Sequence, residues 1–193
     1  MGKIIFQKKG TEWKRFDCPT TIINQTILKK LVSKCYPTVR IIDFASQQLT
    51  DIPPKIFELL NLSELNLHGN KIKQMPKEIG NLKKLYRADF GNNFFSDLPP
   101  EISALKQLRK LDLSFTDFVT LPKEICQLAA LQVLLLDYSE NLVTLPKCLG
   151  VLPRLGKLSI KFTKIKQLPQ SLCENLKQKE VKMDINLEEV CEK

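Results

Sequence analysis

The sequence predicts an α/β fold built as a solenoid, in which stacked coils place parallel strands on a concave face and short helical or 3₁₀ segments on a convex face. Three observations predict it: a recurring apolar motif, an alternation of apolar and other residues inside each copy, and a proline at a fixed place in each copy. Self-similarity at a period of roughly 20 to 50 residues is typical of stacked repeats. The segments here are 23, 23, 23, 23 and 24 residues long, between copies that begin at Val39, Leu62, Leu85, Leu108, Leu131 and Leu155.

Each copy begins with a predicted strand. Its frame is LxxLxLxxNxLxxLPxxIxxLxx, as in LSELNLHGNKIKQMPKEIGNLKK over residues 62–84. Because the side chains of a strand alternate between its two faces, the two central leucines point into the core and the residues between them point outward. The outward residues of successive strands therefore form columns along one face of the array.

A polar residue follows each strand, and a proline starts the return to the next coil. A polar side chain that donates and accepts hydrogen bonds can satisfy the backbone groups of a turn, so we expect these residues to be structural: Gln47, Asn70, Asn93, Thr116, Ser139 and Thr163. Proline has a fixed φ that suits the first position of a short helical segment. That position is predicted for Pro53, Pro76, Pro99, Pro122, Pro146 and Pro169.

The two ends of the array need covers. Residues 1–38 are predicted to be a basic segment followed by a helical cap, which starts at Thr20 or Thr21 and has an apolar face of Ile23, Ile27, Leu28 and Leu31. Residues 39–177 hold six repeats. Residues 178–193 are expected to form a truncated seventh strand and a C-terminal cap, with Val181 and Met183 at the leucine positions.

The frame over residues 39–177 resembles the leucine-rich-repeat superfamily. Its 23-residue period and LPxxI return are similar to the eukaryotic Ras-binding and scaffold type of repeat, including the plant intracellular Ras-group-related proteins. A bacterial effector that carries eukaryotic-type repeats is an alternative source. The resemblance implies a right-handed solenoid that recognises proteins across its concave sheet, without a cofactor and without intrinsic catalysis.

Charge and cysteine content bear on the compartment. Residues 1–38 carry eight Lys or Arg against Glu12 and Asp17, which is +6 of the total of +9. No apolar run reaches the roughly 18 residues of a membrane span, and no signal peptide is visible.

The six cysteines form no CxxC pair, so we expect no metal site and predict reduced thiols, with Cys18 and Cys35 as the one pair to test. The expected location is the cytoplasm, or the host-cell cytoplasm for a secreted effector.

The outward columns supply a first set of candidate binding residues. Acidic residues in one column lie beside basic residues in the next, and the set comprises His68, Arg87, Asp89, Lys110 and Asp112. A mixed surface favours a protein partner, because nucleic acid binding is typical of a uniformly basic stripe. The alternative is that these charges only keep the face solvated.

A second candidate set is aromatic. Phe115, Tyr138 and Phe162 occupy one position of three consecutive copies, just before the polar column, where the earlier copies have Ser46, Gly69 and Asn92. We expect the three rings to form a ladder. Exposed aromatic side chains are typical of interface hot spots, whereas the alternative reading is that the rings pack on each other to cover the edge of the core.

The predicted function is therefore a noncatalytic protein-interaction module, a scaffold or an effector in signalling, that binds a partner protein on the concave face or the adjacent edge. The chain has one histidine and no evident catalytic arrangement, so we expect no enzyme, no small-molecule substrate and no nucleic acid partner. The alternative is a targeting adaptor whose basic N-terminus, with Trp13 and Phe16, binds anionic membrane or ubiquitin-ligase machinery.

Overall fold

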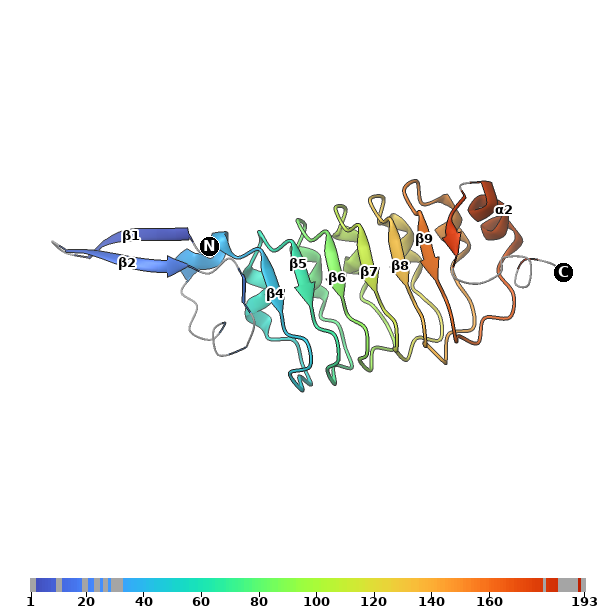
Figure 1. The fold of residues 1–193 in the computed structure, drawn as a ribbon, viewed down its shortest axis with the longest axis horizontal. Helices are drawn as coiled ribbons and strands as arrows, with labels where there is room; N and C mark the ends of the chain where they lie inside the picture. Colours follow the sequence, from blue (N-terminus) through green and yellow to red (C-terminus); the bar gives the residue numbers. More distant parts are fainter. Residues whose placement is uncertain are drawn as a thin grey trace.

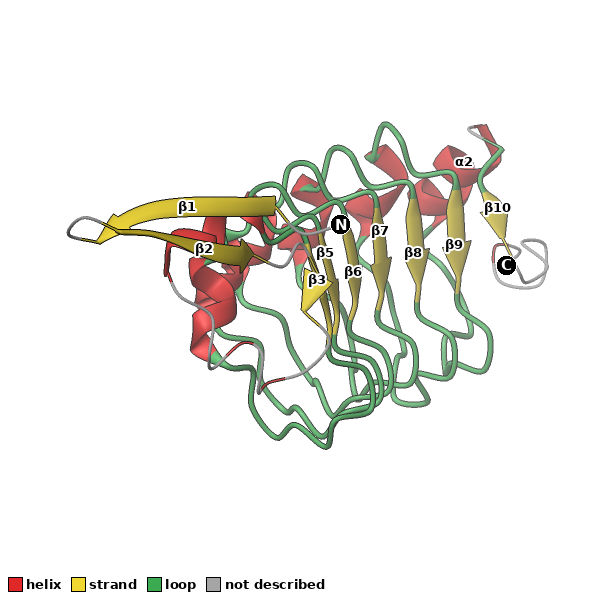
Figure 2. Cartoon of the chain, turned by 60° about the vertical axis from the view of Figure 1, so that its left-hand side comes forward, coloured by secondary structure: helices red, strands yellow, loops and turns green. Residues whose placement is uncertain are grey.

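A computed structural model describes residues 3–9, 12–18, 21–22, 25, 28, 33–178, 180–183 and 191. Side chains before Ile22 lie outside the described part. The chain forms a row of coils whose strands lie side by side (Figure 1). A second view shows the strands along one face and the helical segments on the other (Figure 2). The predicted solenoid architecture is thus confirmed.

The sheet of the solenoid has eight strands, and each pairs in parallel with the next in the chain. The register follows the repeat, so that Glu64 pairs with Arg87 and Arg87 pairs with Lys110. The strands are β3 (Thr21–Ile22), β4 (Ile41–Asp43), β5 (Glu64–Asn66), β6 (Arg87–Asp89), β7 (Lys110–Asp112), β8 (Val133–Leu135), β9 (Lys157–Ser159) and β10 (Lys182–Met183).

On the opposite face, the described segments are short 3₁₀ helices and the α-helix α2. They are η1 (Ser33–Thr38), η2 (Pro54–Glu58), η3 (Lys77–Asn81), η4 (Pro100–Ala104), η5 (Lys123–Gln127), η6 (Lys147–Val151) and α2 (Gln170–Gln178). The proline of each repeat was predicted at the first position of the helix, but the helix begins one residue after it. The proline itself is extended; Pro76, for example, has φ −66° and ψ 148°. Its carbonyl then accepts the first helical hydrogen bond, as from the Ile79 amide.

The core runs the length of the array between the two faces. The strand leucines, the residues after the turn and the inward residues of the 3₁₀ helices are all buried. β6 has Ala88 in place of a leucine, and the same coil has two large buried side chains, Phe90 and Phe95, with their rings 6.2 Å apart at 63°.

The N-terminal region differs from the prediction. β1 (Lys3–Lys9) and β2 (Glu12–Cys18) pair as an antiparallel hairpin that projects from the end of the solenoid in Figure 1. Thr21 does not cap a helix, because it lies in β3 and extends the parallel sheet by one strand. Gln25 and Leu28 are helical and Leu28 is buried, whereas Thr20, Ile23, Ile27 and Leu31 lie outside the described residues.

The prediction of reduced thiols is wrong for all five cysteines whose side chains the structure describes. Cys126 in η5 is bonded to Cys148 in η6, and Cys173 in α2 is bonded to Cys191. Cys126 and Cys148 are 22 residues apart, close to one repeat, so the coil register places their Cα atoms 5.7 Å from each other. Cys35 is also disulfide-bonded, while its predicted pairing with Cys18 concerns a side chain outside the described part.

Candidate functional site

The aromatic residues Phe115, Tyr138 and Phe162 form a ladder of stacked rings. The ring centroids of Phe115 and Tyr138 are 4.4 Å apart at 7°, and those of Tyr138 and Phe162 are 4.5 Å apart at 19°. The separations are close to the spacing of neighbouring strands, about 4.8 Å, which explains why equal positions of successive coils can stack. The three residues remain 49%, 42% and 65% exposed, so the ladder presents a continuous aromatic edge to solvent.

The backbone of the ladder residues is left-handed. Their φ values are +56°, +57° and +56°, and the same position of the earlier coils has Ser46 at +55°, Gly69 at +70° and Asn92 at +52°. The turn after each strand therefore requires this conformation whatever the side chain. Glycine and asparagine adopt it readily, while for a bulky residue it is an outlier.

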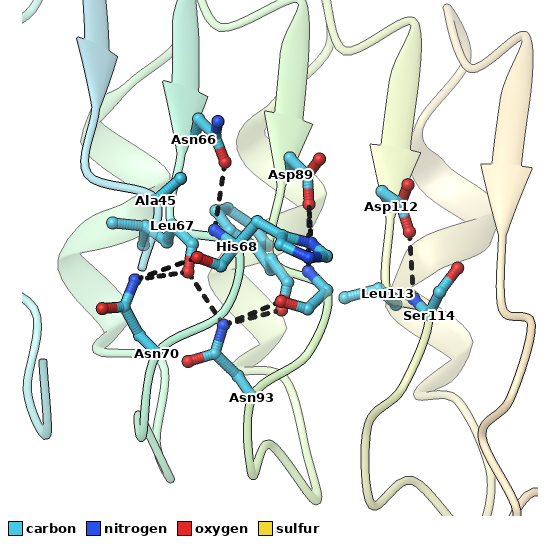
Figure 3. Close-up of polar contacts among 12 residues, drawn as sticks. Ala45, Asn66, Leu67, His68, Asn70, Asp89, Asn93, Asp112, Leu113 and Ser114 are labelled. Carbon is cyan, nitrogen blue, oxygen red and sulfur yellow. Dashed lines mark hydrogen bonds and ion pairs between the residues drawn. The ribbon is translucent and has the colours of Figure 1, made fainter. Parts of the chain in front are cut away.

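The acidic column at the ends of the strands is largely structural. The Asp89 carboxylate accepts the Gly91 amide at 3.2 Å, and the Asp112 carboxylate accepts the Ser114 amide at 3.0 Å (Figure 3). Asn66 does the same for the His68 amide at 3.0 Å. Such bonds to the amide two residues ahead stabilise the turn. Asp89 and Asp112 therefore keep only part of their hydrogen-bonding capacity for a partner.

The buried polar column lies behind these turns. Asn70 donates to the carbonyls of Phe44 and Leu67 and accepts from the amides of Gln47 and Leu49. One coil later, Asn93 donates to the carbonyls of Leu67 and Phe90 and accepts from the Ile72 amide (Figure 3). From the coil of Phe115 onward the column changes to hydroxyls, where Thr116 and Ser139 bond each other and the Leu113 carbonyl. The predicted structural role of this column is confirmed for these residues.

His68 lies against the neighbouring strand end. Its Nδ1 is 3.4 Å from the Asp89 carboxylate, and the side chain is 43% exposed. Gly91 leaves room for this approach, since a Cβ there would lie 3.1 Å from His68 Nδ1, a tight contact. The structure thus brings His68, Asp89 and Asp112 together through the turns of β5, β6 and β7, on an open surface.

Arg87 belongs to a separate group at the start of the strands. Arg87 Nη1 is 3.9 Å from the Glu64 carboxylate, which also accepts the Tyr86 hydroxyl at 2.6 Å. The bond with Glu64 raises the pKa of Tyr86, with a contribution from burial, and Arg87 and Arg109 oppose the shift. Lys110 follows Arg87 in the same column. A hollow of about 190 Å³ on the concave face includes Asp43, Glu64, Arg87 and Asp89.

Sequence reasoning missed two features of this surface. The role of Tyr86 was missed because the residue precedes the strand, outside the columns of the frame. The left-handed backbone of the ladder was missed too, although Gly69 and Asn92 at the same position are a signal of positive φ. Within the described part of the chain, no three His, Cys, Asp or Glu side chains gather to hold a metal ion, and no helix is long and apolar enough to cross a bilayer.

Comparison with known proteins identifies the repeats. The family model Leucine Rich Repeat matches residues 61–82. The solved structure of a leucine-rich-repeat protein from Leptospira interrogans is 32% identical with a TM-score of 0.72 and covers 79% of this chain and 38% of its own. An internalin from Listeria monocytogenes is 19% identical with a TM-score of 0.62, which shows the fold alone, and covers 80% of this chain and 43% of its own. No curated protein sequence matches the chain. The chain thus spans less than half the length of either solved structure.

Proposed function

We propose, on the premise that the chain belongs to the leucine-rich-repeat superfamily, that it is a noncatalytic module that binds a partner protein through its aromatic ladder. Repeats of this superfamily are in general noncatalytic scaffolds for binding other proteins. The ladder edge next to the concave sheet is the contact surface, and the charged residues Arg87, Asp89, Lys110 and Asp112 lie in β6 and β7 of the same sheet. Scaffold, effector and signalling roles all depend on this binding step.

The ladder supports the proposal because the fold does not require its rings. A left-handed conformation costs an aromatic residue about 1 to 2 kcal/mol. A stacked pair contributes about 0.5 to 1.5 kcal/mol, and half-burying a ring contributes about 1 kcal/mol. The strain of the three residues, about 3 to 6 kcal/mol in all, is therefore nearly offset by the two stacked pairs and the three half-buried rings, which together contribute about 4 to 6 kcal/mol. Since asparagine and glycine serve at the same position in earlier coils, exposed aromatic residues there indicate a use outside the fold.

The test replaces the ladder residues with asparagine, which adopts the left-handed backbone of this position readily. A triple variant, Phe115→Asn with Tyr138→Asn and Phe162→Asn, copies the natural Asn92 and should change the free energy of unfolding by less than about 2 kcal/mol. Proteins captured by the native chain should be lost from the variant, with affinity lowered at least about tenfold, because hot-spot rings each contribute about 2 kcal/mol or more. The retained proteins are compared by mass spectrometry.

The matched control changes exposed residues of the opposite face. Lys77→Ala with Lys123→Ala, in η3 and η5, should retain every captured protein. If the triple asparagine variant keeps full affinity, or if its lost binding tracks lost folding, the ladder is structural. The partner surface must then be sought around Arg87 and Lys110.

The disulfides support a second proposal, that the chain works in an oxidising compartment. Disulfides form and persist outside the reducing cytoplasm, whereas the expectations of a cytoplasmic location and of reduced thiols both rested on the lack of a visible signal peptide. Alkylation of the native protein before mass spectrometry should leave Cys126, Cys148, Cys173 and Cys191 unmodified. Alkylation of all four would instead support the cytoplasm.

The targeting adaptor stays a prediction. Its basic and aromatic side chains, among them Trp13 and Phe16, lie outside the described residues. No observation on the solenoid favours it over binding through the ladder.

A further inference from the structure

A basic hollow lies at the start of the strands, on the edge of the sheet away from the ladder. Its volume is about 440 Å³, and its lining consists of Tyr86, Lys106, Gln107, Arg109, Ala130 and Arg154. Gln107, Ala130 and Arg154 occupy one position of three successive coils. Ala130 is a short side chain between the two longer ones. We call this space the basic hollow.

Among the residues that the structure describes, the cations of the basic hollow have no acidic partner. The ion pairs among the described residues are His68 with Asp89 and Arg87 with Glu64, so neither arginine of the hollow is paired with a carboxylate. Lys106 donates to the Gln127 carbonyl at 3.1 Å, which leaves other protons of its ammonium free. Three positive charges therefore converge on a space that no carboxylate lines.

The aromatic wall of the basic hollow has a fixed position. The Tyr86 hydroxyl is held by Glu64 at 2.6 Å, and the residue is 40% exposed. The ring and the Ala130 methyl group give the hollow apolar surface beside its charges. This combination suits an acidic side chain, whose methylene groups can lie on the ring while its carboxylate reaches a guanidinium.

The spacing of the cations favours a ligand with several charges. Arg109 and Arg154 precede β7 and β9, which are separated by one further strand. With strands about 4.8 Å apart, the two coils are about 10 Å from each other, and an extended peptide covers that distance in about three residues. One small anion spans less than this.

We propose that the basic hollow binds a short acidic segment of a protein, with Arg109, Arg154 and Lys106 pairing with its carboxylates across the Tyr86 ring. The inference rests on the proposed protein-binding function for the nature of the ligand, but it concerns a different edge of the sheet and different residues. It adds charge selection to the aromatic contact of the ladder.

The probe is a fluorescein-labelled octaglutamate peptide, with octaglutamine as the neutral counterpart. In fluorescence anisotropy at low ionic strength the full chain should bind octaglutamate, and binding should weaken as salt is added. Arg109→Gln with Arg154→Gln should lower the affinity about tenfold. Lys77→Gln with Lys123→Gln removes the same charge from the convex face and should leave the affinity unchanged.

Three results would overturn the inference. The first is an equal loss of octaglutamate affinity in the arginine double variant and in the lysine double variant, which would mean that net charge alone attracts the peptide. The second is equal binding of octaglutamine. The third is binding of a heparin fragment or of inorganic phosphate without octaglutamate, which assigns the hollow to another class of anion. The triple asparagine variant of the ladder should bind octaglutamate normally, so failure here and failure of the ladder proposal are separable.

Discussion

At the scale of single residues, buried amides fix the turns of the N-terminal coils. Asn70 is 6% exposed, and its side chain satisfies two amides and two carbonyls that no strand partner reaches. A buried donor or acceptor left without a partner costs about 1 to 3 kcal/mol. One side chain therefore stabilises the turns of two coils.

Replacing Asn70 with leucine should be among the most damaging single changes. Asn70→Leu keeps the volume but leaves the amides of Gln47 and Leu49 unsatisfied, so the free energy of unfolding should fall by at least about 3 kcal/mol. Urea unfolding followed by circular dichroism measures it. The exposed Asn141→Leu is the control and should change stability by less than about 0.5 kcal/mol. A loss below about 1 kcal/mol at Asn70 would contradict this account.

The sequence predicts the structural role of polar residues such as Asn70 from their place in the repeat. A polar side chain between buried apolar positions needs a hydrogen-bond partner inside the protein. The frame also predicts the stacking of Phe115, Tyr138 and Phe162, which follows from their equal positions. Their backbone strain is not visible in the aromatic residues themselves, and its one signal in the sequence is the Gly69 and Asn92 that occupy the same position of earlier coils. The turn contacts of Asp89 and Asp112 likewise depend on atoms two residues away.

At the scale of elements, the bond between Cys126 and Cys148 ties η5 to η6. These two helices belong to the coils of Phe115 and Tyr138, so the bond and the first ring pair hold the same two coils on opposite sides. The bond between Cys173 and Cys191 likewise involves the coil of Phe162. The pair Cys126 and Cys148 was not predicted, because the search for cysteine motifs considered only short spacings. Residues about one repeat apart become neighbours only when the coils are stacked in register.

Removing the bond between η5 and η6 should lower stability measurably. Cys126→Ser with Cys148→Ser releases a 22-residue link, which corresponds to about 3 kcal/mol of free energy of unfolding in the chain-entropy account. Guanidinium unfolding of the variant and the native chain, each with the other cysteines intact, measures the difference. Equal stability of the two proteins would mean that the bond is absent or does not constrain the unfolded chain.

At the scale of the whole molecule, each coil is stabilised by contacts with its neighbours. The stability of the array therefore depends on how its two end coils are covered. Ile22 in β3 is fully buried against the first repeat, while Val181 before β10 is 5% exposed at the other end. A repeat array unfolds through nearest-neighbour contacts, and an uncovered end exposes the apolar face of its first coil. The repeat count is readable from the sequence, but β3 is not, because it lacks the frame.

Damage at β3 should therefore spread along the array. Ile22→Ser should lower the melting temperature of the whole chain in one transition, with a loss of about 3 kcal/mol, because a buried apolar side chain is replaced by a hydroxyl without a partner. The matched Leu60→Ser, at a residue that is 58% exposed, should leave the melting temperature nearly unchanged. Calorimetry of both variants checks this, and equal effects would contradict an end-covering role for β3.

The bond between Cys126 and Cys148 also has a mechanical consequence. A solenoid bends when its outer segments separate or approach while the hydrogen-bonded strands keep their spacing. The bond holds the outer segments of two coils with Cα atoms 5.7 Å apart, so the array is stiff against bending at that joint. Adjacent coils such as those of η3 and η4 have no such bond between their described residues and are joined by packing and backbone hydrogen bonds alone. A partner that grips the array from end to end would therefore bend it N-terminal to the ladder, while the spacing of Phe115 and Tyr138 stays constant.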